Sequence, residues 1–230
     1  MIDIHSHILP FVDDGSESVE TSLGLLKKAE DTGVTDIILT PHYKFSYKKS
    51  PEEIKAVFLE LENKKKEANI GVNLYLGNEI HYSKNTRKIL SENGVLTLNG
   101  TKYVLIEFDY FNQSDITEAV YGLIRDGFVP IVAHVERYAY VSIADILEIK
   151  EMGGLIQVNA GSLVGDCRRK IKKLVKKLFK LSLVDFISSD EQASRKNYFA
   201  DARAYVTKKF GKEVSDKVFI LNAKKIIGQA

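Results

Sequence analysis

Short runs of β-branched and aliphatic residues recur along the chain, and longer segments with helical periodicity lie between them. The seven runs cover residues 2–4, 36–39, 72–76, 103–106, 129–132, 155–158 and 184–187. After the second run, Ile54, Val57 and Leu61 recur at spacings of three and four, which places them on one face of a helix. This α/β alternation predicts parallel strands joined by crossover helices, and seven repeats favour a closed barrel over an open sheet.

Helix boundaries are marked clearly in several places. Ser50 is a candidate N-cap, Pro51 suits the first helical position, and Glu53 completes a capping box. Gly127 and Gly153 are expected to end two other helices. No linker rich in Gly, Ser or Pro divides the chain, and a single α/β barrel commonly reaches this length. We therefore predict one catalytic domain over residues 1–230.

The composition is that of a globular protein in a reducing compartment. Hydrophobic residues make up 44% and charged residues 28% of the chain, and the net charge of +2 is too small to indicate a nucleic-acid partner. The N-terminus lacks the pattern of a signal peptide, and no apolar run is long enough to span a membrane. Cys167 is the only cysteine, which excludes an internal disulfide framework. We predict cytoplasmic localisation without membrane insertion.

Side chains that bind metal ions stand at the ends of nearly all predicted strands. In chain order they are His5 and His7, His42, Glu79, Glu107, His134 and, after the seventh strand, Asp190, while the sixth strand ends in Asn159. The carboxyl ends of parallel strands meet at one edge, where active sites of α/β proteins are built. Mixed imidazole and carboxylate ligands suit Zn, Mn or Fe. Each residue alone has an ordinary structural explanation, but together they predict a site for several metal ions.

The spacing of the first ligands supports the same interpretation. His5 and His7 are two residues apart in an extended segment, so their side chains point the same way and can reach one ion. Asp14 follows in a loop where Gly15 permits a tight turn, and Glu79 could bridge two ions. His81, in the next loop, is interpreted as a bystander.

Several metal ions in a polar pocket would neutralise phosphate oxygens, lower the pKa of a bound water and align it for in-line attack. Arg137 could bind a phosphoryl group through two hydrogen bonds, although an ion pair with Glu136 or another acid explains it equally well. Arg195 is a second candidate. The residues thus predict metal-assisted hydrolysis of a phosphate ester.

Seven stretches carry a resemblance to a known family. They are DIHSHILP at 3–10, VDDGS at 12–16, TPH at 40–42, GNEI at 77–80, IEF at 106–108, AHVERY at 133–138 and QVNAGS at 157–162. They resemble the polymerase-and-histidinol-phosphatase (PHP) superfamily. More narrowly, the chain is similar to the manganese-dependent protein-tyrosine phosphatases of Gram-positive capsule and exopolysaccharide operons.

The resemblance implies a distorted (β/α)7 TIM-like barrel of the PHP fold. It also implies two to three metal ions per chain, with Mn²⁺ expected first and Fe or Zn as alternatives. The implied substrate is phosphotyrosine on a partner protein, expected to be a cognate tyrosine kinase. Position by position, the implied metal ligands are His5, His7, Asp14, His42, Glu79, Glu107, His134 and Asp190, with Arg137 and Arg195 as phosphate-binding residues.

The chain departs from this family at the last strand. Family members carry a Ser-Asp-x-His signature there, whereas Gln192 stands here in place of the histidine. A neutral amide is a poor ligand for a transition metal, so one of three sites is expected to be weak, empty or completed by Glu191. The hypothesis is that two ions bind firmly and that activity is low or altered.

Three alternatives to a metal-dependent phosphatase fit the residues to different degrees. A cysteine-dependent phosphatase needs an arginine six residues after its nucleophile, but Lys173 follows Cys167 at that spacing, so this alternative fails. Another PHP phosphoesterase or an amidohydrolase-type metal hydrolase stays open, since these amidohydrolases also begin with His-x-His on a first barrel strand. A degenerate metal-binding regulatory protein with low activity also stays open because of Gln192.

A strongly basic segment runs over residues 168–180. Its Lys and Arg side chains alternate with Ile171, Leu174, Val175, Leu178 and Phe179 at spacings of three and four. This pattern predicts an outer barrel helix with an apolar inner stripe. Docking to an acidic surface is the alternative.

Overall fold

The structure is a computed structural model that describes residues 1–165 and 167–229. Its strands are β1 Ile2–Ser6, β2 Asp36–Leu39, β3 His42–Tyr43, β4 Asn73–Leu76, β5 Glu79–His81, β6 Tyr103–Glu107, β7 Val129–Val132, β8 Leu155–Asn159 and β9 Phe186–Ser188. Its α-helices are α1 Val19–Asp31, α2 Pro51–Glu67, α3 Thr86–Ser91, α4 Ile116–Arg125, α5 Ile143–Met152, α6 Ala160–Val164, α7 Arg169–Lys180, α8 Phe199–Phe210, α9 Lys212–Asp216 and α10 Asn222–Ile227. Shorter helical segments are η1 Leu98–Gly100, η2 Val135–Arg137 and η3 Lys217–Leu221.

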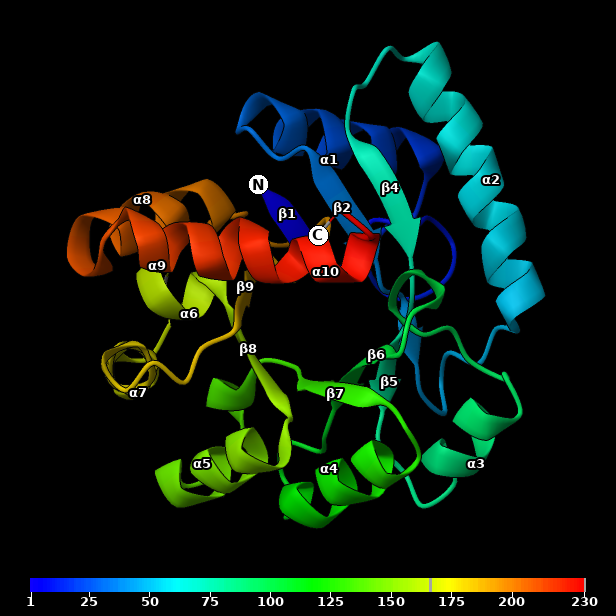
Figure 1. Ribbon diagram of the computed structural model, residues 1–230. Helices are drawn as coiled ribbons and strands as arrows, with labels where there is room; N and C mark the ends of the chain where they lie inside the picture. Colours follow the sequence, from blue (N-terminus) through cyan, green and yellow to red (C-terminus); the bar gives the residue numbers. More distant parts are fainter. Residues whose placement is uncertain (166, 230) are drawn as a thin grey trace.

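All paired strands run parallel. Strands β1, β2 and β4 form one sheet, and β3, β5, β6, β7, β8 and β9 form the other. The pairing of β2 with β4 continues directly into that of β3 with β5, because Leu39 pairs with Leu76 and His42 with Glu79. After β9, the Asp190 amide donates to the His5 carbonyl, which links the last strand region to the first. The strands therefore form one curled parallel arrangement with helices outside it (Figure 1).

Each of the seven predicted strand runs overlaps an observed strand, which confirms the parallel α/β class. The third and seventh strands begin later than predicted, at Asn73 and Phe186. His42 and Glu79 follow β2 and β4 as predicted, and each also begins a short strand, β3 and β5, that was not predicted. These strands are two and three residues long, too short to leave a hydrophobic pattern in the sequence.

Several helix predictions are confirmed in detail. At the start of α2, the Ser50 hydroxyl accepts from the Glu53 amide and the Glu53 carboxylate accepts from the Ser50 amide. Helix α5 ends at Gly153, which has a φ of 98°. Helix α7 buries Val175, Leu178 and Phe179 and turns most of its basic residues outward, as expected for an outer helix. None of the helices in the described residues combines the length and apolarity needed to cross a bilayer.

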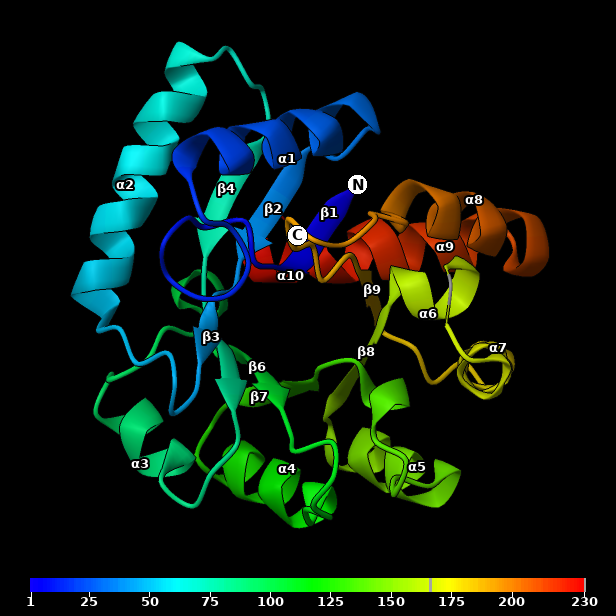
Figure 2. The same ribbon diagram turned by 180° about the vertical axis from the view of Figure 1, so that it is seen from behind.

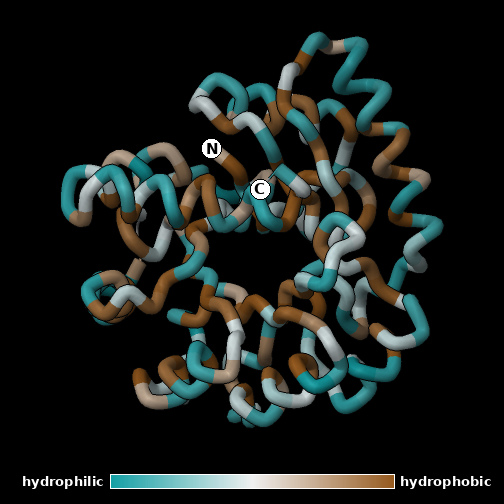
Figure 3. Tube along the Cα trace, viewed as in Figure 1, coloured by the Kyte–Doolittle hydropathy of each residue, from teal (hydrophilic) through white to brown (hydrophobic). Residues whose placement is uncertain are grey.

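The interior of the curled sheet is apolar at the end where the strands begin. A hydrophobic cluster there joins strand residues such as Ile38, Leu105, Ile131 and Phe186 to Ile226 of α10. The views from the two sides show α10 crossing beside β1 (Figure 2). Hydrophobic positions follow the strands, whereas hydrophilic positions are frequent on the outer helices (Figure 3). The opposite end of the strands is therefore the one available for polar chemistry.

Candidate metal centre

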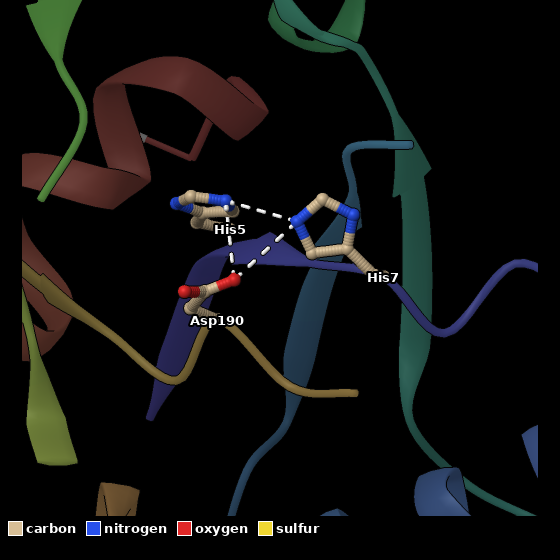
Figure 4. A group of neighbouring side chains, drawn as sticks. All are labelled: His5, His7 and Asp190. Carbon is tan, nitrogen blue, oxygen red and sulfur yellow. Dashed lines mark hydrogen bonds and ion pairs between the residues drawn. The ribbon is translucent and has the colours of Figure 1, made fainter. Parts of the chain in front are cut away.

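His5 and His7 meet Asp190 at the carboxyl end of the sheet (Figure 4). The two histidine Nε2 atoms lie 3.2 Å apart. Asp190 Oδ1 lies 3.7 Å from Nε2 of His5 and 3.4 Å from Nε2 of His7. All three side chains are buried. The predicted first pair of ligands thus faces a carboxylate from the other end of the chain, which the wrapped arrangement brings beside β1.

Glu79 lies at the centre of the site, between four imidazoles. Its Oε1 is 2.8 Å from His134 Nε2 and 3.3 Å from His5 Nε2. Its Oε2 is 2.8 Å from His42 Nδ1 and 3.4 Å from His7 Nε2. Glu79 is only 1% exposed. A carboxylate with each oxygen directed at a different pair of histidines has the arrangement of a group that bridges two cations.

The remaining predicted ligands, Glu107 and Asp14, lie on the side of the cluster next to His42. Glu107 Oε1 at the end of β6 is 3.4 Å from His42 Nδ1, and Asp14 Oδ1 is 3.6 Å from His42 Nε2. Asp14 is half-exposed, so it lies at the edge of the cluster. His81, interpreted as a bystander, is 3.3 Å from Glu107 through its Nδ1. The structure therefore brings all eight predicted ligands to one region and adds His81 beside them.

Asp13 is a functional residue that the sequence analysis missed. Its Oδ2 lies 2.7 Å from His7 Nδ1 and accepts a hydrogen bond of 2.9 Å from the His42 amide. A carboxylate on the far ring nitrogen fixes the orientation of a ligating imidazole. A Cβ at Gly15 would come within 2.0 Å of the His7 carbonyl oxygen, so the loop needs glycine there. The Asp-Asp-Gly sequence was the available signal, but it did not distinguish the two acids.

Gln157 and Asn159 of β8 form a second supporting network. Gln157 Oε1 accepts from the His134 amide at 2.7 Å and lies 3.3 Å from His5 Nδ1. Gln157 Nε2 donates to Asn159 Oδ1, and Asn159 Nδ2 donates to Asp190 Oδ2, both at 2.7 Å. These amides orient ligands contributed by three other segments. A polar residue inside an otherwise apolar strand was the signal that could have identified Gln157.

The two predicted phosphate-binding arginines converge on Asp190. Arg137 Nη2 and Arg195 Nη1 lie 3.0 Å and 2.9 Å from Asp190 Oδ2. Arg137 also donates to the Tyr110 hydroxyl, which in turn donates to Glu107. The ion pair of Arg137 is therefore with Asp190 and not with its neighbour Glu136.

One cavity of about 220 Å³ joins the ligands to the arginines. It is lined by Asp14, His42, Lys44, Glu79, Glu107, Tyr110, His134, Arg137, Asp190, Gln192 and Arg195. Gln192, which stands where the resemblance implies a histidine, thus lines the same cavity as the candidate ligands. Glu191 faces a neighbouring cavity instead, which it lines together with Cys167 and Tyr198.

The neighbouring charges hold two acids of the cluster, Glu79 and Asp190, in the ionised form. Burial alone would raise the pKa of Glu79, but the charges of His5 and His42 and the contact with His134 hold it well below its ordinary value. Burial is likewise outweighed at Asp190, where His7, His5 and Arg137 lower the pKa. The site therefore presents carboxylates, which are the forms that coordinate cations.

The neighbouring Glu191 has the opposite character. Burial is the main cause that raises its pKa to about 8, and the charge of Asp3 is the second cause. In the described part of the chain its Oε1 has no hydrogen-bond partner. Glu191 is thus a buried acid beside the site, and the geometry gives no support to its completing a metal site in place of Gln192.

Cys167 behaves as the sequence analysis expects of a thiol without a catalytic role. Its Sγ donates to the Ser162 carbonyl, and burial raises its pKa. A raised pKa disfavours the reactive thiolate. This agrees with the exclusion of a cysteine-dependent phosphatase.

The fold and this cluster define a class of α/β proteins that gather imidazole and carboxylate side chains at the carboxyl end of a curled parallel sheet. The chain belongs to the CpsB/CapC family of capsular polysaccharide synthesis, whose family model matches residues 1–228. The resemblance noted in the sequence is thereby confirmed at the level of the family.

Individual relatives agree with this assignment. The chain is 38% identical to CapC of Staphylococcus aureus, over 83% of this chain and 76% of that protein. It is 33% identical to the tyrosine-protein phosphatase CpsB of Streptococcus agalactiae, over 99% and 98% of the two chains. The tyrosine-protein phosphatase YwqE of Bacillus subtilis is 31% identical, over 93% and 87%.

Solved structures show the same fold. The chain superposes with a TM-score of 0.93 and 29% identity on a crystal structure from work on YwqE of Bacillus subtilis and CpsB of Streptococcus pneumoniae, described as unique metal-dependent tyrosine phosphatases; 100% of this chain and 96% of that chain are covered. A phosphotriesterase from Mycobacterium tuberculosis has a TM-score of 0.63 at 10% identity, covering 99% and 94%. The second likeness concerns the fold alone.

Proposed function

We propose that this chain is a metal-dependent phosphoric monoester hydrolase that removes phosphate from phosphotyrosine in proteins. The observation that carries the proposal is the single cavity in which the His and carboxylate cluster meets Arg137 and Arg195. The names of the relatives CpsB and YwqE support phosphotyrosine as the substrate. A cognate tyrosine kinase involved in capsule or exopolysaccharide synthesis is the partner we propose.

The donor atoms fit divalent metal ions. His42 Nδ1 and Glu79 Oε2 lie 2.8 Å apart, yet neither makes a hydrogen bond within the described residues. The Nε2 atoms of His5 and His7 also face each other. Buried lone pairs that converge in this way are satisfied by a cation. The ligands we propose are His5, His7, Asp14, His42, Glu79, Glu107, His134 and Asp190.

We propose that Mn²⁺ occupies the site, as the resemblance implies. Fe and Zn accept the same ligands, and the availability of each metal decides among them. Two ions would share Glu79, whose oxygens face different histidine pairs. A third ion near His42 and Asp14 would be held weakly, because a neutral amide, Gln192, lines the same cavity in place of an expected histidine. Counting metal in purified protein tests this, and three tightly retained ions per chain would contradict it.

When bound, such ions polarise phosphoryl oxygens and lower the pKa of water for in-line attack. The residues of the chain do the rest. Arg137 and Arg195, which converge on Asp190, can pair with the remaining phosphoryl oxygens. Tyr110 orients Arg137 through the hydrogen bond to its hydroxyl. Asp13 and Gln157 hold the rings of His7 and His5 in place.

The proposal extends to the whole chain. We propose a distorted (β/α)7 barrel, which is supported if β2 with β3 and β4 with β5 are each counted as one interrupted strand. We propose that residues 1–230 form one catalytic domain that works in the cytoplasm, as the single thiol at Cys167 suggests.

The test is hydrolysis of p-nitrophenyl phosphate and of a phosphotyrosine peptide by protein loaded with Mn²⁺, Fe²⁺ or Zn²⁺. We expect turnover of both substrates that a chelator abolishes and that returned metal restores. Hydrolysis of a cyclic amide without any phosphatase activity would instead indicate an amidohydrolase. Tight metal binding without turnover of any substrate would indicate a regulatory protein.

A further inference from the structure

Two highly exposed phenylalanines each follow directly on a residue that lines the metal cavity. Lys44 in the loop after β3 and Tyr110 in the loop after β6 both line this cavity. The residue that follows each of them is a phenylalanine: Phe45 is 92% exposed and Phe111 is 93% exposed. The opening therefore has a large apolar side chain on each of two rim loops, one residue beyond a residue of the cavity wall.

This exposure is exceptional in the molecule. Among the other large apolar side chains of the described residues, exposure reaches at most 62%, at Leu59 of α2. An aromatic ring that stays in water gains nothing for folding, and apolar groups gathered at the rim of a polar site are typical of surfaces that bind other molecules. Phe45 and Phe111 thus have the properties of contact residues for something larger than a phosphate group.

The loop that carries Phe111 is ordered by its own hydrogen bonds. Asp109 Oδ1 accepts from the amides of Phe111 and Asn112, at 2.8 Å and 2.7 Å. The Asp109 carbonyl accepts from the Tyr140 hydroxyl at 2.8 Å. The Asp109 carboxylate is therefore committed to its own loop, and the ring of Phe111 is presented by a defined backbone.

The loop that carries Phe45 is also ordered, and it is positively charged. The backbones of Lys44 and Tyr47 exchange two hydrogen bonds. The ammonium groups of Lys44 and Lys48 lie over the rings of Tyr47 and Phe45, at 5.3 Å and 5.4 Å from the ring centres. In the described residues no carboxylate lies within 4.0 Å of either ammonium group. These two charges are available to an acidic partner.

We propose that Phe45, Phe111 and Lys48 bind the protein segment on either side of the phosphotyrosine, with apolar side chains on the two rings and an acidic side chain at Lys48. This rests on the proposed function, because it assigns the substrate of the same cavity. The occupant is an extended phosphotyrosine segment with apolar and acidic neighbours. Its apolar residues cover the exposed rings while the phosphate enters the cavity between them.

The experiment compares wild-type protein with the double variant Phe45→Ala, Phe111→Ala on three probes. One is p-nitrophenyl phosphate. The second is a peptide with leucine on each side of phosphotyrosine and glutamate outside, and the third has serine and lysine at those places. For wild type we expect kcat/KM to be about tenfold higher for the leucine and glutamate peptide. The double variant should lose through KM the part of this preference that the two rings supply, keep the part that Lys48 supplies, and keep wild-type activity on p-nitrophenyl phosphate. Leu59→Ala is the matched control, since it removes an exposed apolar side chain of α2 that does not line the cavity.

Binding is measured separately, with the first peptide carrying a non-hydrolysable phosphonate. We expect the double variant to bind this peptide about tenfold more weakly than wild type and the Leu59→Ala variant do. Equal affinities, or equal kcat/KM ratios for the two peptides in wild type and double variant, would overturn the docking surface. If wild type binds the peptide through these rings but hydrolyses no phosphate ester, the proposed function fails and the docking surface stands.

Discussion

The two ends of the curled sheet differ sharply although the same strands build both. In β6, Leu105 lies in the apolar cluster inside the sheet, and Glu107, two residues later, faces the metal cavity. In β7, Ile131 belongs to the cluster and His134 follows the strand. Residues two apart in a strand share a face, so one face changes from core to site within two positions. Stability and chemistry are thereby assigned to opposite ends.

Removing the central acid should have the largest effect on the polar end. We expect Glu79→Gln to lower kcat/KM by more than about a hundredfold and to reduce the number of retained metal ions, because both oxygens of Glu79 face histidines. Metal analysis and phosphatase assay measure this. Glu60→Gln, on the outside of α2, should change neither quantity. Full activity of the Glu79→Gln variant would refute the central role of this residue.

A substitution that creates a cavity at the apolar end should instead lower the stability of the fold. Phe186 is 2% exposed within the cluster that contains α10 residues. We expect Phe186→Ala to lower the free energy of unfolding by about 3–5 kcal/mol. Chemical denaturation measures this, with the exposed Phe111→Ala as a control expected to stay within about 0.5 kcal/mol of wild type. The activity per folded molecule should be retained in Phe186→Ala, and a large loss would show that the two ends are coupled.

The smallest effect concerns Glu191, an acid that lies beside the site and is buried. The pKa of Glu191 is raised from 4.5 to about 8, so between these pH values the folded state holds a proton that the unfolded state has lost. Stability therefore falls as the pH rises through this window. Glu191→Gln removes the dependence and should be more stable than wild type by about 1–3 kcal/mol at pH 8, and similar at pH 4.5. Denaturation at both pH values tests this, and an equal difference at both would contradict it.

The pattern of hydrophobic residues along the sequence predicted the longer strands well and the shortest ones poorly. Strands β6, β7 and β8 contain β-branched and aliphatic runs that match their bounds closely. Strands β3 and β5 consist of two and three residues that include His42 and Glu79. They are held by pairing with neighbours and not by a hydrophobic pattern of their own, so no periodicity marks them.

Most of the ligands could be predicted because they lie near the carboxyl ends of strands or in the loops that follow, and parallel strands end at a common edge. The supporting residues could not. Asp13 differs from Asp14 only in which ring nitrogen it reaches, and Gln157 acts through contacts with segments far away in the chain. The sequence predicts His81 to be a bystander, but its Nδ1 lies 3.3 Å from Glu107 Oε1. Such contacts arise from the curvature of the sheet, which local sequence does not encode.

The sequence by itself determined the α/β class, the family and the set of candidate ligands, because periodicity and strand-end chemistry are local properties. The tertiary structure decided how that set is arranged. It placed Glu79 between four histidines, turned Gln192 toward the cavity and Glu191 away from it, and put Phe45 and Phe111 at the opening. These relations join residues from separate strands and loops, so they exist only once the sheet has curled and its last strand region has met β1.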